Sequence, residues 1–199
     1  GVDSLGITTT NVTCFNGNDG SISVTTVYGG ASPYSYNWTP ATGTSNSVTG
    51  LSAGVEFIEI TDNNNCVLLD FVNITSPSAI SDSTIVTPTT CGNSNGEIAI
   101  YPTGGGGSPY TFVWSSGTPS STPTSSTVTG LAPTNLVITI NDNSGCSEEF
   151  TFNVNPSEFV ISIDSLTDVT CNGLSDGYSS VAISGGETPY AYDWSTGQN

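Results

Sequence analysis

Lysine, arginine and histidine are absent from all 199 positions, whereas 17 residues are aspartate or glutamate. Without cations the chain has no basic patch for nucleic acid and no cationic face for an anionic membrane. Catalytic dyads and metal sites that need histidine are excluded, as are crosslinks that start from lysine. The net charge of −17 favours solubility through self-repulsion, and resistance to trypsin-like proteases is a second, compatible explanation.

Three further signals are missing from the sequence. No apolar run reaches membrane-spanning length, and no segment is typical of a signal peptide. Helical periodicity is also missing, and we expect Gly1 and Asn199 to be the edges of a fragment.

What the chain does contain is an internal repeat of about 80 residues, two copies of which are full and the third begun. Leu51 and Leu131 are 80 positions apart. Each copy also carries Pro-Tyr-x-aromatic-x-Trp after a Gly-Gly pair, beginning at Pro33, Pro109 and Pro189. This period fits small domains with their own cores. We predict domains at 1–77, 78–157 and 158–199, the last being the N-terminal half of a third repeat.

Cysteine usage indicates an oxidising compartment. Cys14 and Cys66 are separated by 52 positions, and Cys91 and Cys146 occupy the corresponding places 55 positions apart. We therefore predict one disulfide per repeat, Cys14–Cys66 and Cys91–Cys146, with free buried thiols as the alternative. Cys171 would then bond a cysteine 52–55 positions further on, unless it is a reactive or intermolecular thiol.

Short runs of Val, Ile, Thr, Tyr and Phe alternate with turn residues throughout. Six or seven such strands per repeat predict an all-β fold of tandem, immunoglobulin-like antiparallel β-sandwiches. Overlay of the repeats places Ile58, Ile60 and their counterparts inward. Glu56 shares that face and is expected at the sheet margin, because a buried unpaired carboxylate is costly.

The aromatic segment of each repeat has two explanations. Alternation puts its three rings on one face, either as a platform for sugars or as the sandwich core beside the disulfide. We favour the core because every repeat needs apolar mass inside. The predicted core aromatics are Tyr34, Tyr36, Trp38, Tyr110, Phe112, Trp114, Tyr190, Tyr192 and Trp194.

The loop after the first cysteine contains Asp19 in the first repeat and Asp176 in the third. It resembles an oxygen-rich calcium loop. The second repeat has Asn95-Gly96 instead, which keeps the turn and drops the charge, so we favour a structural turn and keep calcium as the alternative. No other cofactor is expected. Asp62 and Asp142 are predicted to cap hairpin turns.

The sequence contains no recognisable arrangement of catalytic residues. The carboxylates form no recurring pair, and nucleophiles lack the usual base and oxyanion groups. We therefore expect no enzyme activity.

The landmarks Cys-x-Gly-x-x-Asp-Gly, Gly-Gly-x-x-Pro-Tyr-x-Tyr-x-Trp and Thr-Asp-x-x-x-Cys resemble the SprB repeat. That module is found in very large surface proteins of Bacteroidetes, gliding adhesins among them. The resemblance implies export by the type 9 secretion system, an extracellular place on the outer surface, and work with the gliding machinery.

The motif Asp-Ser occurs once per repeat and resembles the acceptor of the general O-glycosylation system of Bacteroidetes. The candidates for modification are Ser4, Ser83 and Ser165, and a strand-start cap from the aspartate is the alternative.

We therefore expect a stalk of a surface filament that presents adhesion to an external surface or polysaccharide. An array of carbohydrate-binding modules and a passive spacer for an enzyme elsewhere in the parent chain remain open. Neither nucleic acid nor membrane insertion is expected.

Overall fold

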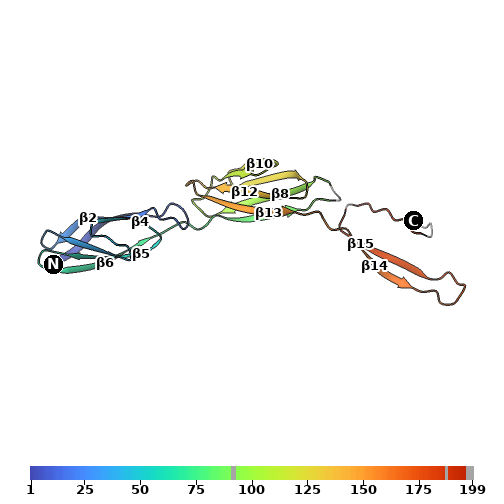
Figure 1. Cartoon of the computed structure of the whole chain (residues 1–199), viewed down its shortest axis with the longest axis horizontal. Helices are drawn as coiled ribbons and strands as arrows, with labels where there is room; N and C mark the ends of the chain where they lie inside the picture. Colours follow the sequence, from blue (N-terminus) through green and yellow to red (C-terminus); the bar gives the residue numbers. More distant parts are fainter. Residues whose placement is uncertain (91–92, 187, 196–199) are drawn as a thin grey trace. The chain divides into compact units, whose positions relative to one another are not determined.

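The computed structural model describes residues 1–90, 93–186 and 188–195. Within these ranges all regular structure is β-strand, fifteen strands in all (Figure 1). None of the described residues forms a helix of a length and hydrophobicity that would cross a bilayer. The prediction of an all-β, antiparallel fold is confirmed.

The first repeat folds as two three-stranded sheets around one core. One sheet has the order β1-β2-β4 and the other β3-β5-β6. The six strands are β1 Val2–Thr10, β2 Gly20–Gly29, β3 Ser35–Thr39, β4 Ser47–Leu51, β5 Gly54–Thr61 and β6 Val67–Ile74. Buried side chains of both sheets, including Ile22, Trp38 and Ile58, form a single cluster. This packing of two inner faces defines a β-sandwich.

The second repeat has the same layered plan. A four-stranded sheet has the order β10-β11-β8-β7 and a three-stranded sheet the order β13-β12-β9. The strands are β7 Ser81–Thr87, β8 Gly96–Thr103, β9 Thr111–Trp114, β10 Thr118–Thr122, β11 Ser125–Leu131, β12 Thr134–Asn141 and β13 Ser147–Val154. Its core joins Ile98, Val128 and Leu136 from the two sheets.

Strand β5 and its counterpart β12 show why the inward faces were predictable. Alternate residues of both strands are buried, so Ile58, Ile60, Ile138 and Ile140 all point inward as expected. Glu56 lies at the sheet margin, one residue beyond the last β3–β5 pair, Thr39–Phe57. Its side chain is nevertheless buried, and Oε2 accepts a hydrogen bond from the Ala41 N–H at 3.0 Å. That bond supplies the partner whose absence would make burial costly.

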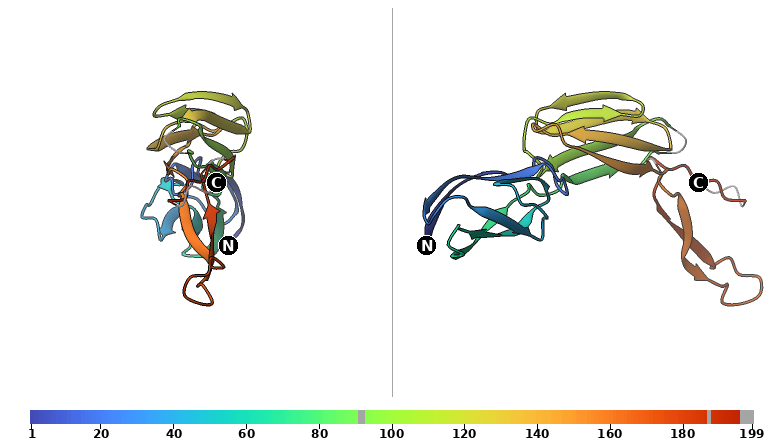
Figure 2. Two further views of the ribbon diagram at one scale, coloured as in Figure 1. Left: turned by 90° about the vertical axis from the view of Figure 1, so that its right-hand side faces the viewer. Right: turned by 60° about the vertical axis from the view of Figure 1, so that its left-hand side comes forward.

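The third repeat contributes the hairpin of β14 Val160–Thr167 and β15 Tyr178–Ser184, the orange to red pair of strands in Figure 2. By residue contacts the chain forms two compact units. Unit 1 comprises residues 1–82, 102–112 and 139–148, and unit 2 comprises 83–101, 113–138 and 149–199. The domain boundaries near 77 and 157 stay predictions.

Candidate functional site

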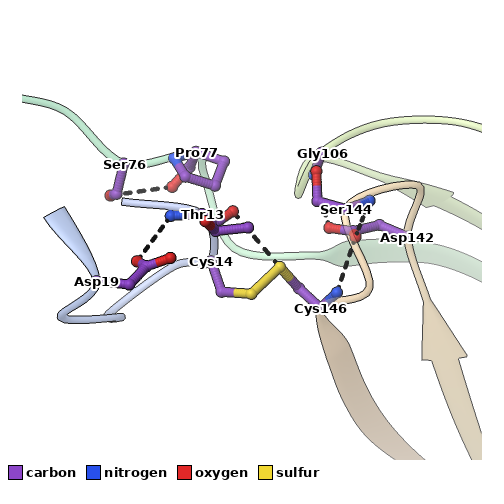
Figure 3. Close-up of a disulfide and its surroundings, with 9 residues drawn as sticks. All are labelled: Thr13, Cys14, Asp19, Ser76, Pro77, Gly106, Asp142, Ser144 and Cys146. Atoms are coloured by element: carbon purple, nitrogen blue, oxygen red, sulfur yellow. Dashed lines mark hydrogen bonds between the residues drawn. A yellow bond between two sulfur atoms is a disulfide. The ribbon is translucent and has the colours of Figure 1, made fainter. Parts of the chain in front are cut away.

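A disulfide joins Cys14 of the first repeat to Cys146 of the second, and both residues belong to unit 1 (Figure 3). Their Cα atoms are 5.6 Å apart across a sequence separation of 132. Cys146 is only 9% exposed, and its Sγ lies 3.5 Å from the carbonyl oxygen of Thr13. The covalent link therefore connects consecutive sequence repeats.

The predicted pairing of Cys14 with Cys66 is wrong: Cys66 is an exposed, unpaired thiol. Strand β6 explains the error. Cys66 directly precedes this strand, whereas the turn of Cys14 lies at its far end, where the Val12 N–H bonds the Thr75 carbonyl at 2.9 Å. The nine residue steps from Cys66 to Thr75, along β6, span about 30 Å, and a disulfide needs Cα atoms within about 7 Å.

The other predicted pairing, Cys91–Cys146, is also wrong, because Cys146 is already bonded to Cys14. Cys91 itself lies outside the described residues. Cys171 is an exposed, unpaired thiol, and the proposed partner further along the chain stays a prediction.

Asp142 builds the turn that presents Cys146. Its Oδ1 accepts hydrogen bonds from the backbone N–H groups of Ser144 at 2.8 Å and Cys146 at 3.0 Å (Figure 3). Its Oδ2 accepts a bond from the Gly106 N–H at 2.6 Å. Burial acts to raise the pKa of Asp142, but the backbone donors of Gly106, Cys146 and Ser144 together outweigh it and lower the pKa below the usual value of 3.8.

The same turn is built around Cys66. Asp62 Oδ1 accepts bonds from the N–H groups of Asn64 and Cys66, each at 2.8 Å, and Oδ2 accepts one from Ala31 at 3.1 Å. The bond from Cys66 is the largest cause that lowers the pKa of Asp62. The predicted capping role of both aspartates is confirmed, and each also ties the hairpin to the loop that follows the Gly-Gly pair.

The glycine pair allows this close approach. Gly105 has φ +58°, and a Cβ there would overlap Oδ2 of Asp142. The adjacent Gly104 carbonyl accepts a hydrogen bond from the Tyr110 hydroxyl at 2.8 Å. Tyr34 bonds Gly29 and Tyr190 bonds Gly185 in the same way. The Gly-Gly and Pro-Tyr landmarks are visible in the sequence, but the hydrogen bond from the tyrosine hydroxyl to the first glycine's carbonyl is not.

A second turn presents Cys14. Asp19 Oδ1 accepts a bond from the Thr13 N–H at 2.9 Å, and Asp176 does the same for Thr170 at 3.1 Å. In the second repeat the Asn95 side-chain oxygen bonds the Thr90 N–H at 2.9 Å. The bonds from their threonines lower the pKa values of Asp19 and Asp176. An amide can replace the carboxylate because the turn needs only an acceptor.

Calcium gains no support from this loop. In the described parts of the chain, no group of three or more cysteine or acidic side chains lies in position to hold a metal ion.

The aromatic segments sit mainly against the cores. Trp38 is 2% exposed, and its indole N–H donates to the Ser45 carbonyl at 2.9 Å. Trp114 is half-buried and donates to Ser126 Oγ at 2.9 Å. Tyr110 is buried, and Tyr34, Tyr36, Phe112, Tyr190 and Trp194 are half-buried. The core placement of Tyr192 is wrong: its ring is exposed, because the described part of the third repeat forms only the β14–β15 sheet, with no second sheet to cover it.

The Asp-Ser motifs lie on strands at sheet edges. In β1 and β14 the register shifts between Val2 and Ser4 and between Ile163 and Ser165, so the aspartate is the extra residue of a β-bulge in both. Ser4 and Ser83 are exposed. Ser165 is half-buried and shares a hydrogen bond with the Tyr178 hydroxyl at 2.8 Å.

These features define a tandem array of β-sandwich repeats with a covalent link between two of them. The chain belongs to the SprB repeat family: a model of the SprB repeat matches residues 6–43, 83–119 and 163–199. A search of curated proteins gives no match. The SprB repeat is a structural repeat and not an enzyme family, and it is found in surface-exposed proteins.

Proposed function

We propose that this chain is a stalk segment of a secreted, filamentous cell-surface adhesin that serves gliding motility and attachment. Membership of the SprB repeat family supports a repeat segment of an adhesin-like surface protein. The bridge Cys14–Cys146 supports the stalk, because it joins the two repeats directly and a pulling force need not pass through residues 15–145.

The burial of Trp38 and the internal hydrogen bonds of Trp38 and Trp114 favour a stalk over an array of carbohydrate-binding modules. Such modules would need an exposed aromatic in a groove of every repeat. Trp38 is buried, and both it and Trp114 spend their indole N–H groups on internal acceptors. The alternative function, a passive spacer for an enzyme elsewhere in the parent chain, can be distinguished from a stalk by the sequence that flanks these residues.

The partners follow from the same proposal. The filament would touch an external surface or polysaccharide, and would reach the outer surface through the type 9 secretion system. Serines 4, 83 and 165 would carry O-glycans, and the exposure of Ser4 and Ser83 on edge strands supports access for a transferase. Peptide masses of protein from a Bacteroidetes host should show glycan on these serines and on none of their alanine variants.

Deletion of residues 1–157 from the parent gene tests the function. We expect the shortened protein to be displayed on the cell but adhesion and gliding to fall, because reach is lost. The matched control deletes the same length and replaces it with another pair of SprB repeats, which should restore both. Unchanged adhesion and gliding with the deleted form displayed would contradict a stalk role.

A further inference from the structure

The bridge joins two kinds of turn, and among the described residues each kind also occurs once with its cysteine free. Cys14 lies in the turn held by the Thr13–Asp19 hydrogen bond, and the Gly17 N–H bonds the Cys14 carbonyl at 2.9 Å. Cys171 lies in the same turn, with the Thr170–Asp176 bond and the Leu174 N–H on the Cys171 carbonyl at 3.2 Å. We call this the first-cysteine turn.

The second partner of the bridge is duplicated as well. In the second-cysteine turn the aspartate N–H bonds the cysteine carbonyl, at 2.9 Å for Asp142 and Cys146 and at 3.0 Å for Asp62 and Cys66. The aspartate Oδ1 accepts the cysteine N–H in both. Cys66 therefore has the backbone frame in which Cys146 is bonded.

We propose that Cys14–Cys146 is one link of a repeating pattern in which the first cysteine of each SprB repeat bonds the second cysteine of the next. Cys66 is then the bonding position for a first-cysteine turn of another repeat, and Cys171 for a second-cysteine turn. The direct observation is the bond itself, formed between these two turn types and not within one sandwich. The inference depends on this geometry and not on the proposed role in adhesion.

The segment Ser78–Ile80, between the strands of the first and second repeats, lies beside the bridge and the second-cysteine turn of Cys146. The Gly105 N–H donates to the Ser78 carbonyl at 3.0 Å, and Ile80 is buried. A depression of about 300 Å³ beside the disulfide is lined by Ser78–Ile80 together with Phe15 and Glu148. A first-cysteine turn bonded to Cys146 therefore contacts a surface formed by the segment that directly precedes β7, the first strand of the second repeat. At Cys66 the neighbour is Gly1, at the entry to β1.

Formation of each link removes two electrons and two protons from two thiols. A disulfide oxidant, of small-molecule or protein type, accepts them and becomes two thiols. In the exchange step a cysteine thiolate attacks a mixed disulfide, the new S–S bond forms, and the leaving thiolate departs with the electron pair of the broken bond.

Three mixtures of the 199-residue chain test the pairing rule. One partner carries Cys171 activated as a mixed disulfide with thionitrobenzoate, in a chain with Cys66→Ser and Cys91→Ser. The other offers a free thiol at Cys66, in a chain with Cys91→Ser and Cys171→Ser. Release of thionitrobenzoate reports the rate, and peptide masses after pepsin digestion at acid pH report the bond.

The two like pairs, Cys171 with Cys171 and Cys66 with Cys66, are the controls, because charge repulsion and chain size are the same in all three mixtures. We expect the Cys171–Cys66 bond to form at least tenfold faster than either like pair. Equal rates, or a faster like pair, would overturn the rule. The size of undigested parent protein from cells, measured without reductant, then separates a link within one filament from a link between two, since only the latter holds dimers together.

Discussion

Cys66 and Cys146 occupy nearly the same turn but have different chemical states. Both N–H groups bond an aspartate Oδ1, and both aspartates are buried and tied to the loop after a Gly-Gly pair. Cys146 is bonded to Cys14, whereas Cys66 is exposed and free. The turn is therefore built by its aspartate and does not depend on the disulfide, which is an addition made when a first-cysteine turn lies opposite.

The largest expected effect comes from breaking the bridge. Cys146→Ser should lower the total free energy of unfolding of the two sandwiches by about 5 kcal/mol, because a loop of more than 130 residues is no longer closed in the unfolded chain. Urea unfolding measures it, with Cys66→Ser as the control. If Cys66→Ser costs as much as Cys146→Ser, the difference between the two turns is not real.

A smaller effect is expected from the aspartate caps. Asp142→Asn and Asp62→Asn should each lower the free energy of unfolding by about 2 kcal/mol. The asparagine side chain has only one acceptor oxygen, so one backbone N–H loses its acceptor. Glu59→Gln, on the exposed face of β5, removes the same charge and should change stability little. A cost for Asp142→Asn alone would indicate that the cap works through the disulfide.

Acid should weaken both turns. The folded pKa values of Asp62 and Asp142 lie below the ordinary 3.8. Their contribution is therefore complete above pH 3.8 and is lost as the pH falls through the lower folded values. Thermal unfolding from pH 6 to pH 2 should show this loss, and the double Asp→Asn variant should have a flatter profile. A loss that begins well above pH 4 would point to other groups.

The smallest effect concerns two equivalent buried positions. Val12 precedes Cys14 by two residues, and Thr89 is at the corresponding place in the second repeat. Thr89 is fully buried, and its hydroxyl has no hydrogen-bond partner among the described residues. Thr89→Val should therefore stabilise the protein by about 1 kcal/mol and Val12→Thr should destabilise it, both by urea unfolding. Destabilisation by Thr89→Val would show that the hydroxyl is satisfied in solution.

Much of the fold was predictable because the repeat supplies an internal comparison. Alternation alone placed Ile58 and Ile138 inward, and turn chemistry identified Asp62 and Asp142 as caps. The burial of Glu56 could not be predicted, because its hydrogen-bond donor is the backbone N–H of Ala41, fifteen positions away, and a backbone donor leaves no mark in the sequence.

The cysteine pairing could not be predicted for a different reason. A fixed period places the cysteines identically whether bonds form within repeats or between them, so spacing cannot choose. What chooses is the length of β6, which holds Cys66 and the turn of Cys14 at opposite ends of the sandwich. That separation is known only from the three-dimensional structure, which shows what lies at each end of β6.

The disulfide map tests the central claim most directly. Trypsin cannot cut a chain without lysine or arginine, so pepsin is used on the oxidised, unreduced protein at acid pH, where thiol exchange is slow. Mass spectrometry should find the peptide of Cys14 linked to that of Cys146, with Cys66 free. A Cys14–Cys66 linkage would contradict a covalent bond between repeats.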